Sequence, residues 1–114
     1  MKVLVIGAGL VGTYICEYLS SEDHDVTVIE KDAAVVRKAQ DALDALVIHG
    51  DGASPSLLEE AGLRNCEMVV AVSPNDEVNI LACLAAAKAG VKIKIARLRN
   101  PEFSREDALL GKKE

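Results

Sequence analysis

The chain has 114 residues, and its 13 Lys and Arg against 18 Asp and Glu give a formal net charge of −5. The length fits one domain with a single hydrophobic core. The negative charge argues against a non-specific nucleic-acid binder, which needs a positive face. No apolar run approaches the roughly 18–20 residues that span a bilayer. The amino terminus starts with a strand-like Val-Leu-Val-Ile run, which is not typical of a signal peptide.

The three cysteines are Cys16, Cys66 and Cys83. They are odd in number and widely spaced, so they match neither a metal-binding spacing nor a disulfide framework. We therefore expect buried thiols in a reducing cytosol and no metal site.

Five short segments rich in Val and Ile are predicted as strands: residues 2–6, 25–30, 45–49, 67–72 and 92–98. The first four are almost continuously apolar, which is typical of parallel strands buried on both faces.

Segments with helical periodicity follow each strand. They are residues 10–22, a helix after the N-cap Asp32, a short helix between Ser54 and Gly62, residues 75–89, and a helix from Pro101 through Phe103, Ala108 and Leu109. The alternation predicts an α/β fold, a Rossmann-like doubly wound parallel sheet of five to six strands with helices on both faces. We expect residues 1–114 to form this single domain.

The sequence Gly7-Ala8-Gly9-Leu10-Val11-Gly12 matches the GxGxxG pattern of dinucleotide-binding folds. An apolar strand precedes it and an amphipathic helix follows, which is the required context. Gly7 would allow the tight turn, Gly9 would let a pyrophosphate approach the backbone, and Gly12 would let the helix pack closely. The free amides at the helix start would bind the phosphates. The alternative is a tight turn with no ligand.

Glu30 ends the second predicted strand, 18 residues after Gly12. This is the expected place for the acid that binds the ribose hydroxyls. Its charge would repel a 2′-phosphate and favour NAD over NADP, although the adjacent Lys31 weakens that repulsion. The alternative is a solvated acid at a strand end.

The other strand ends add candidates, because the carboxyl ends of parallel strands line the binding crevice. After the third strand, Asp51, Gly52 and Ala53 follow Gly50 in a loop that could hold adenine, although Asp51 could equally form a turn or cap a helix. The fourth strand ends in Ala71, Val72 and Ser73. Arg97 and Arg99 flank the end of the fifth, where a guanidinium could reach phosphate.

The sequence contains no arrangement that predicts catalysis. His24 lies in a polar turn and His49 ends a strand, and neither has a recognisable nucleophile or acid partner. The sequence predicts a site that binds a nucleotide rather than one that transforms it, so we expect no catalytic residues.

Several segments together resemble the TrkA family of potassium uptake regulators, over nearly the whole chain. They are residues 1–12, residues 24–30, Gly50-Asp51-Gly52, residues 58–62, Ala71-Val72-Ser73 followed by residues 76–79, and residues 96–103. The resemblance is to the N-terminal domain of that family, called the RCK or KTN domain. It departs at Ser73, where the family usually has Thr.

The resemblance implies a cytoplasmic regulatory domain that gates a potassium transporter or channel in response to NAD(H) or to ATP, ADP or AMP. It would act at the inner face of the membrane, as a homodimer or larger homo-oligomer, without nucleic acid. Leu10 stands where some ATP-binding relatives carry Arg, which favours NAD(H). The resemblance also implies that the chain is the N-terminal part of a longer protein or a short subunit.

The Ala-rich fourth helix and residues 101–110 are candidate contact surfaces between subunits. Polar replacement of Phe103 and Leu110 is expected to weaken self-association, unless these residues fold back on their own domain. Two other functions fit the glycine motif. One is the cofactor-binding half of an NAD-dependent oxidoreductase. The other is a redox-sensing repressor. That function finds no support in the sequence, because nothing in it resembles a DNA-binding helix-turn-helix.

Overall fold

The computed structural model describes residues 1–104. The predicted helical positions Ala108 and Leu109, and Leu110 of the candidate contact surface, therefore lie outside the described residues. The elements follow the predicted alternation of strands and helices. They are β1 (Lys2–Ile6), α1 (Leu10–Ser21), β2 (Asp25–Glu30), α2 (Ala33–Ala42), β3 (Leu46–His49), α3 (Pro55–Glu60), the 3-10 turn η1 (Leu63–Asn65), β4 (Met68–Ala71), α4 (Asp76–Lys88), β5 (Ile93–Ala96) and α5 (Pro101–Ser104).

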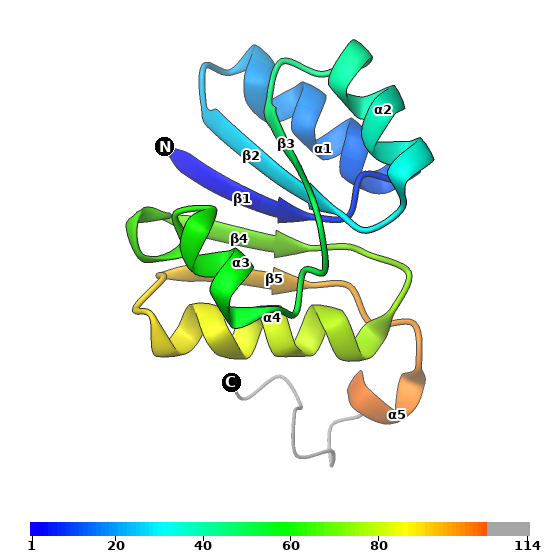
Figure 1. Ribbon diagram of the computed structural model, residues 1–114. Helices are drawn as coiled ribbons and strands as arrows, with labels where there is room; N and C mark the ends of the chain where they lie inside the picture. Colours follow the sequence, from blue (N-terminus) through cyan, green and yellow to red (C-terminus); the bar gives the residue numbers. More distant parts are fainter. Residues whose placement is uncertain (105–114) are drawn as a thin grey trace.

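The five described strands form one parallel sheet in the order β3-β2-β1-β4-β5. Helices α1 and α2 lie on one side of it, and α3 and α4 lie on the other (Figure 1). The order reverses between β1 and β4, and ligands of such sheets bind at this switch point. The prediction of a doubly wound sheet with helices on both faces is confirmed.

The core consists of two apolar layers, one on each face of the sheet. Along β1, Leu4 and Ile6 belong to the layer with α3 and α4, whereas Val3 and Val5 belong to the layer with α1 and α2. Alternate residues of a strand point to opposite faces. A strand covered on both sides is therefore apolar at every position, as the sequence is here.

One part of the strand prediction is wrong. Strand β3 was expected to be buried on both faces, but it lies at the edge of the sheet, and Leu46 and His49 are exposed. A short apolar run does not reveal how many neighbours a strand has. Strands β4 and β5 are also one or two residues shorter at each end than predicted, because the ladder pairs only residues 68–71 with 93–96.

The helix ends follow the predicted local chemistry. Asp32 accepts hydrogen bonds from the Ala34 and Val35 amides, and Ser54 accepts one from the Leu57 amide. Gly62 has φ +90°, a left-handed conformation that glycine adopts without strain. None of the helices in residues 1–104 is long and apolar enough to cross a membrane.

Candidate nucleotide-binding site

The loop between β1 and α1 has a conformation that only glycine allows at two positions. Gly7 has φ +102°, and a Cβ there would lie 2.8 Å from Cα of Ser73. A Cβ on Gly12 would collide with the carbonyl oxygen of Gly7. Gly9 differs, since a Cβ there would meet nothing within 4 Å. The first and third glycines therefore let the loop pack against β4 and α1, and the second borders open space.

The start of α1 faces that open space with unpaired amides. Gly9 is the N-cap residue, and no side chain of residues 1–104 caps this helix. Thr13 Oγ1 donates instead to the Ala8 carbonyl at 3.0 Å, which fixes the loop against the first turn. Free amides at the positive end of a helix dipole form a ready anion site.

Glu30 joins the two loops at the carboxyl ends of β1 and β2. The Ala8 amide donates to its Oε1 at 2.7 Å, and the Asp32 amide donates to its Oε2 at 2.9 Å. Both bonds are charge-assisted, so they hold the carboxylate firmly. Each oxygen keeps a lone pair for a further donor, such as a hydroxyl.

In the loop after β3, the hydrogen bonds of Asp51 show that it forms a turn. Its Oδ1 accepts from the Ala53 amide at 2.9 Å, and its carbonyl accepts from the Ser54 amide at 3.0 Å. Asp51 is therefore the turn former, and Ser54 caps α3. A Cβ on Gly52 would collide with the side chain of Ile6, so this loop lies directly on the end of β1.

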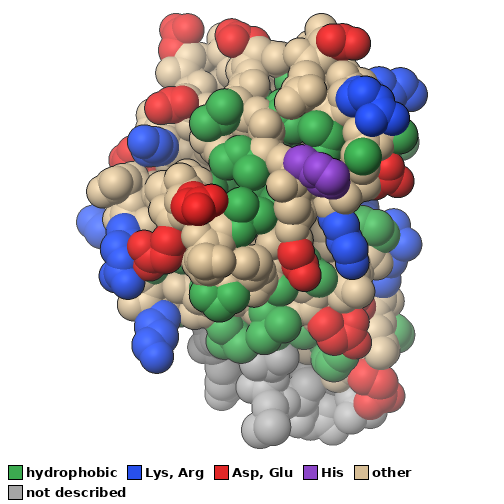
Figure 2. All heavy atoms as spheres, in the orientation of Figure 1, with side chains coloured by type: hydrophobic (Ala, Val, Ile, Leu, Met, Phe, Trp, Pro, Cys, Tyr) green, Lys and Arg blue, Asp and Glu red, His purple; other side chains and the backbone are tan. Residues whose placement is uncertain are grey.

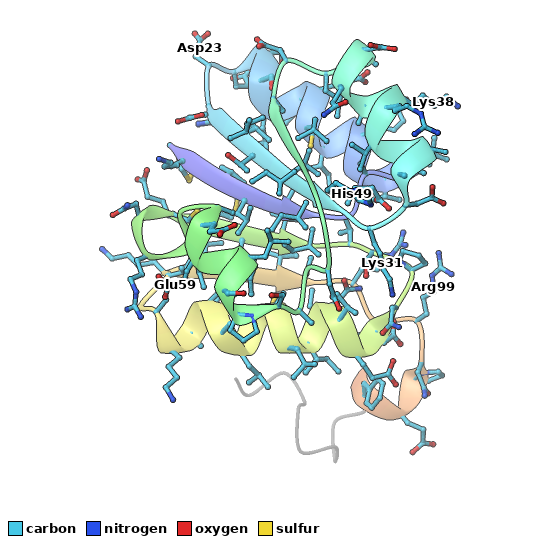
Figure 3. All side chains as sticks on the ribbon, viewed as in Figure 1. Asp23, Lys31, Lys38, His49, Glu59 and Arg99 are labelled. Carbon is cyan, nitrogen blue, oxygen red and sulfur yellow. The ribbon has the colours of Figure 1, made fainter. Side chains whose placement is uncertain are left out.

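These loops surround a pocket of about 490 Å³ at the carboxyl edge of the sheet. This is within the usual range for small-molecule sites, about 300–1,000 Å³. Six of the predicted site residues line it: Gly7, Glu30, Lys31, Asp51, Gly52 and Ser73. In Figure 3 the labelled Lys31, His49 and Arg99 lie toward this end of the strands, while Asp23 and Glu59 lie toward the other.

The remaining predicted site residues surround this pocket or lie apart from it. Gly9 and Leu10 line a second hollow of about 430 Å³, between α1 and α2. Val11 is partly exposed in the first turn of α1, Ala53 lies in the Asp51 turn, and Gly12, Ala71 and Val72 are buried beneath the loops. Arg97 lines a groove on the α1 side of β4 and β5.

The sequence analysis missed the role of Asn79, which is fully buried on α4. Its Oδ1 accepts from the amide and the hydroxyl of Ser73, at 3.0 and 2.8 Å. Its Nδ2 donates to the carbonyls of Ser73 and Arg97, both at 2.9 Å. One side chain thus joins the ends of β4 and β5 beside the pocket. One feature of the sequence could have indicated that Asn79 is buried: its spacing places it on the same face of the helix as Ala82 and Ala86, which are also buried.

Asp76, in the first turn of α4, holds the loop that follows β5. The Arg99 amide donates to both its carboxylate oxygens, at 2.9 and 3.0 Å, and the Asn100 amide donates to Oδ2 at 2.7 Å. These hydrogen bonds hold the pKa of Asp76 below 3.8, the ordinary value of an aspartate. The hydrogen bond from the Arg99 amide has the largest effect, and the one from the Asn100 amide comes next. The charged carboxylate therefore fixes the path of the chain from β5 into α5.

We expect this anchor to be lost at acid pH. Because the pKa of Asp76 is lower in the folded than in the unfolded chain, its contribution is complete at pH values above the unfolded pKa. It is lost as the pH falls through the lower folded pKa. A carboxyl NMR titration should give that folded pKa. Over the same pH range the Arg99 and Asn100 amides should lose their protection against hydrogen exchange, measured relative to an unstructured peptide at the same pH. Asp76→Asn should show little protection at every pH; strong protection in that variant would contradict the anchor.

The three cysteines are free thiols, and burial raises the pKa of Cys16 to about 11. Within residues 1–104 no group of three His, Cys, Asp or Glu could hold a metal ion. Charged side chains of both signs are interspersed over the face in Figure 2, with hydrophobic side chains exposed between them.

This fold and site define a Rossmann-like nucleotide-binding domain: a doubly wound parallel sheet, a glycine loop at its switch point and an acid at the end of β2. The sequence model of the TrkA-N domain matches residues 3–111, so the chain belongs to the TrkA-N domain family. The resemblance to TrkA proteins is thereby confirmed.

Two curated relatives illustrate the match. The Trk system potassium uptake protein TrkA of Haemophilus influenzae is 37% identical over 107 residues, which cover 93% of this chain and 23% of the relative. The TrkA homolog of Methanothermobacter thermautotrophicus is 40% identical over 102 residues, covering 90% and 47%. The chain thus spans 23% of the length of the first relative and 47% of the second.

Solved structures show the same fold. The Kef C-terminal domain of Shewanella denitrificans, in its AMP-bound form, matches with a TM-score of 0.69 and 22% identity, over 83% of this chain and 57% of that one. The GsuK channel bound to NAD matches with a TM-score of 0.67 and 16% identity, over 76% and 16%.

Proposed function

We propose that this chain is a nucleotide-binding regulatory domain that gates a potassium transporter or channel. The observation that most directly supports this proposal is the pocket lined by the glycine loop and by Glu30. Two backbone amides hold the Glu30 carboxylate in place. The names of the curated relatives support the link to potassium uptake.

The ligand in this proposal is an adenine nucleotide, and NAD(H) is preferred. The adenosine would occupy the pocket beside Asp51 and Gly52, with its ribose hydroxyls donating to Glu30. The phosphates would lie at Gly9 and the first amides of α1. The NAD-bound GsuK channel and the AMP-bound Kef domain support this ligand class. A carboxylate at Glu30 disfavours the 2′-phosphate of NADP(H).

The proposed partner is a membrane potassium transporter or channel subunit, contacted from the cytoplasm at the inner face of the membrane. A nucleotide can shift such an assembly only if it binds one arrangement more tightly than another. The outward face of α4 is a candidate subunit contact, because Leu81 and Leu84 are 51% and 53% exposed. Helices that are apolar all round are usually buried.

The test is calorimetric titration of the purified chain with NADH, NAD, ATP, ADP, AMP and NADPH. The proposal expects NAD(H) to bind with NADPH excluded. Tighter binding of ATP, ADP or AMP would leave the proposed regulatory function in place but would change the proposed ligand. No binding to any of them would overturn the site.

The alternative, the cofactor-binding half of an oxidoreductase, rests on the fold alone. A reductase from Escherichia coli O157:H7, ChuY, matches with a TM-score of 0.61 at 22% identity. The curated relatives favour the regulator. Turnover of NADH by the protein would reverse that preference.

A further inference from the structure

The start of α4 separates two hollows at the carboxyl edge of the sheet. On one side is the proposed nucleotide pocket, whose wall here consists of Ser73, Pro74, Asn75 and Val78. On the other side is an open groove of about 550 Å³, formed with α5 and the loop before it, which lie beside the start of α4 (Figure 1). Pro74 and Asn75 line both hollows. A ligand in the pocket would therefore touch the residues that also form one wall of the groove.

Asn79 links the pocket wall to the end of β5. Its side chain binds the amide, the hydroxyl and the carbonyl of Ser73 at 2.8 to 3.0 Å, and it donates to the Arg97 carbonyl at 2.9 Å. Asn79 is fully buried, and breaking hydrogen bonds of a buried polar group is costly. The bonds therefore keep Ser73 and the end of β5 in a fixed relation.

Asp76 links the first turn of α4 to the loop after β5. Its carboxylate accepts from the amides of Arg99 and Asn100, and no other acceptor among residues 1–104 binds these two amides. Asn100 in turn begins α5, because its Oδ1 accepts from the Glu102 amide at 2.9 Å and its carbonyl accepts from the Phe103 amide at 3.1 Å. The place of α5 on the domain therefore depends on the carboxylate of Asp76.

We propose that nucleotide binding is coupled, through the start of α4, to the order of the β5–α5 segment (residues 97–103). The coupling rests on the proposed function, because its ligand is the nucleotide of that site. The segment has a held state, in which its amides are bound to Asp76, and a released state. A nucleotide that packs against Pro74 and Asn75 fixes the first turn of α4, so it keeps Asp76 in place and favours the held state.

A coupling of this kind is reciprocal. If the nucleotide favours the held state by a given factor, then release of the segment weakens nucleotide binding by the same factor. Such factors are typically about 5- to 150-fold. The segment leads into α5, so nucleotide occupancy would decide how firmly α5 is positioned. This gives the nucleotide a means of favouring one arrangement of a regulated assembly over another.

The experiment measures amide hydrogen exchange of the whole chain by NMR, without ligand and with saturating NADH, ATP, ADP or AMP. Protection of the Arg99 and Asn100 amides should rise by about fivefold or more when a nucleotide binds. Amides of such exposed loops exchange by local opening, which a ligand acting only on global unfolding leaves unchanged. The Asn65 amide, which donates to the Gly62 carbonyl in η1, is the internal control and should keep its protection.

Two alanine variants complete the experiment. Asp76→Ala removes the acceptor of the two amides and introduces a good helix former. Glu77→Ala is the matched control, since it removes the neighbouring acid of the same turn, whose carboxylate has no hydrogen bond or ion pair within residues 1–104. In Asp76→Ala the Arg99 and Asn100 amides should be unprotected with and without nucleotide. Calorimetry should show weaker nucleotide binding than in Glu77→Ala, by the factor that the nucleotide adds to protection in the unmodified chain.

The outcomes separate the coupling from the proposed function. Unchanged protection of Arg99 and Asn100 while a nucleotide binds would overturn the coupling and leave the proposed function in place. An Asp76→Ala variant that binds as tightly as Glu77→Ala would do the same, as would an equal rise in protection at Asn65, which would indicate general stabilisation. If none of the four nucleotides binds the unmodified chain, the proposed function fails and the coupling fails with it. Far-UV circular dichroism should show both variants to be folded, because both replaced side chains are at the surface.

Discussion

Replacing Asn79 with leucine is expected to lower the free energy of unfolding by about 3–5 kcal/mol. Leucine is larger than asparagine, so the loss does not come from a cavity. It comes from the Ser73 amide, the Ser73 carbonyl and the Arg97 carbonyl, which would lose their partner. Each buried polar group left unpaired costs roughly 1–3 kcal/mol.

Urea unfolding followed by far-UV circular dichroism would measure this loss, since the chain has no tryptophan for fluorescence. The matched control is Asn65→Leu, at an exposed position of η1, where we expect a change within about 0.5 kcal/mol. Equal stability of the two variants would show that the Asn79 hydrogen bonds contribute little.

Asn79→Asp separates hydrogen bonding from shape. A carboxylate is nearly isosteric with the amide, but it cannot donate to the two carbonyls that Nδ2 now serves. Burial among these acceptors should raise its pKa, so the folded chain would bind a proton more tightly than the unfolded chain. The variant should therefore be least stable near neutral pH and regain stability as the pH falls through the folded pKa.

The parts of the site that the sequence predicted are those set by local rules. Gly7 and Gly12 occupy positions where the turn and the helix packing exclude a Cβ, and Glu30 follows β2 at a fixed distance in the chain. These requirements involve neighbours along the chain and one adjacent strand. The spacing of glycines after an apolar run is therefore enough to identify them.

The parts that the sequence could not predict depend on contacts between distant segments. In the sequence, Asn79 looks like an ordinary polar residue in an Ala-rich helix. It can link the ends of β4 and β5 only because the fold brings both strand ends beside it. Asp76 was expected to start a helix, yet it binds amides 23 and 24 residues further along. Arg97 was expected to reach phosphate, which stays a prediction. Its place on the α1 side is decided by the pairing of β5 with β4, which composition does not encode.

Glu30→Gln should reduce the affinity for NAD(H) by roughly tenfold to a hundredfold, the equivalent of about 1.5–3 kcal/mol for hydrogen bonds to a charged group. The glutamine oxygen can accept from Ala8 or from Asp32, but its amide nitrogen cannot accept from the other. The variant would therefore lose both the ribose acceptor and part of the link between the two loops.

Loss of affinity alone would not distinguish a ribose contact from a displaced loop, so the decisive quantity is the ratio of NADPH to NADH affinity. Removing the negative charge also removes its repulsion of the 2′-phosphate, and Lys31 at the pocket edge would then attract that group. We expect the ratio to rise in Glu30→Gln and to stay unchanged in Glu60→Gln, an exposed acid on α3 away from the pocket. A displaced loop would weaken both ligands equally. An unchanged ratio in calorimetric titrations would therefore assign Glu30 to the loops alone and remove the physical basis for preferring NAD(H) over NADP(H).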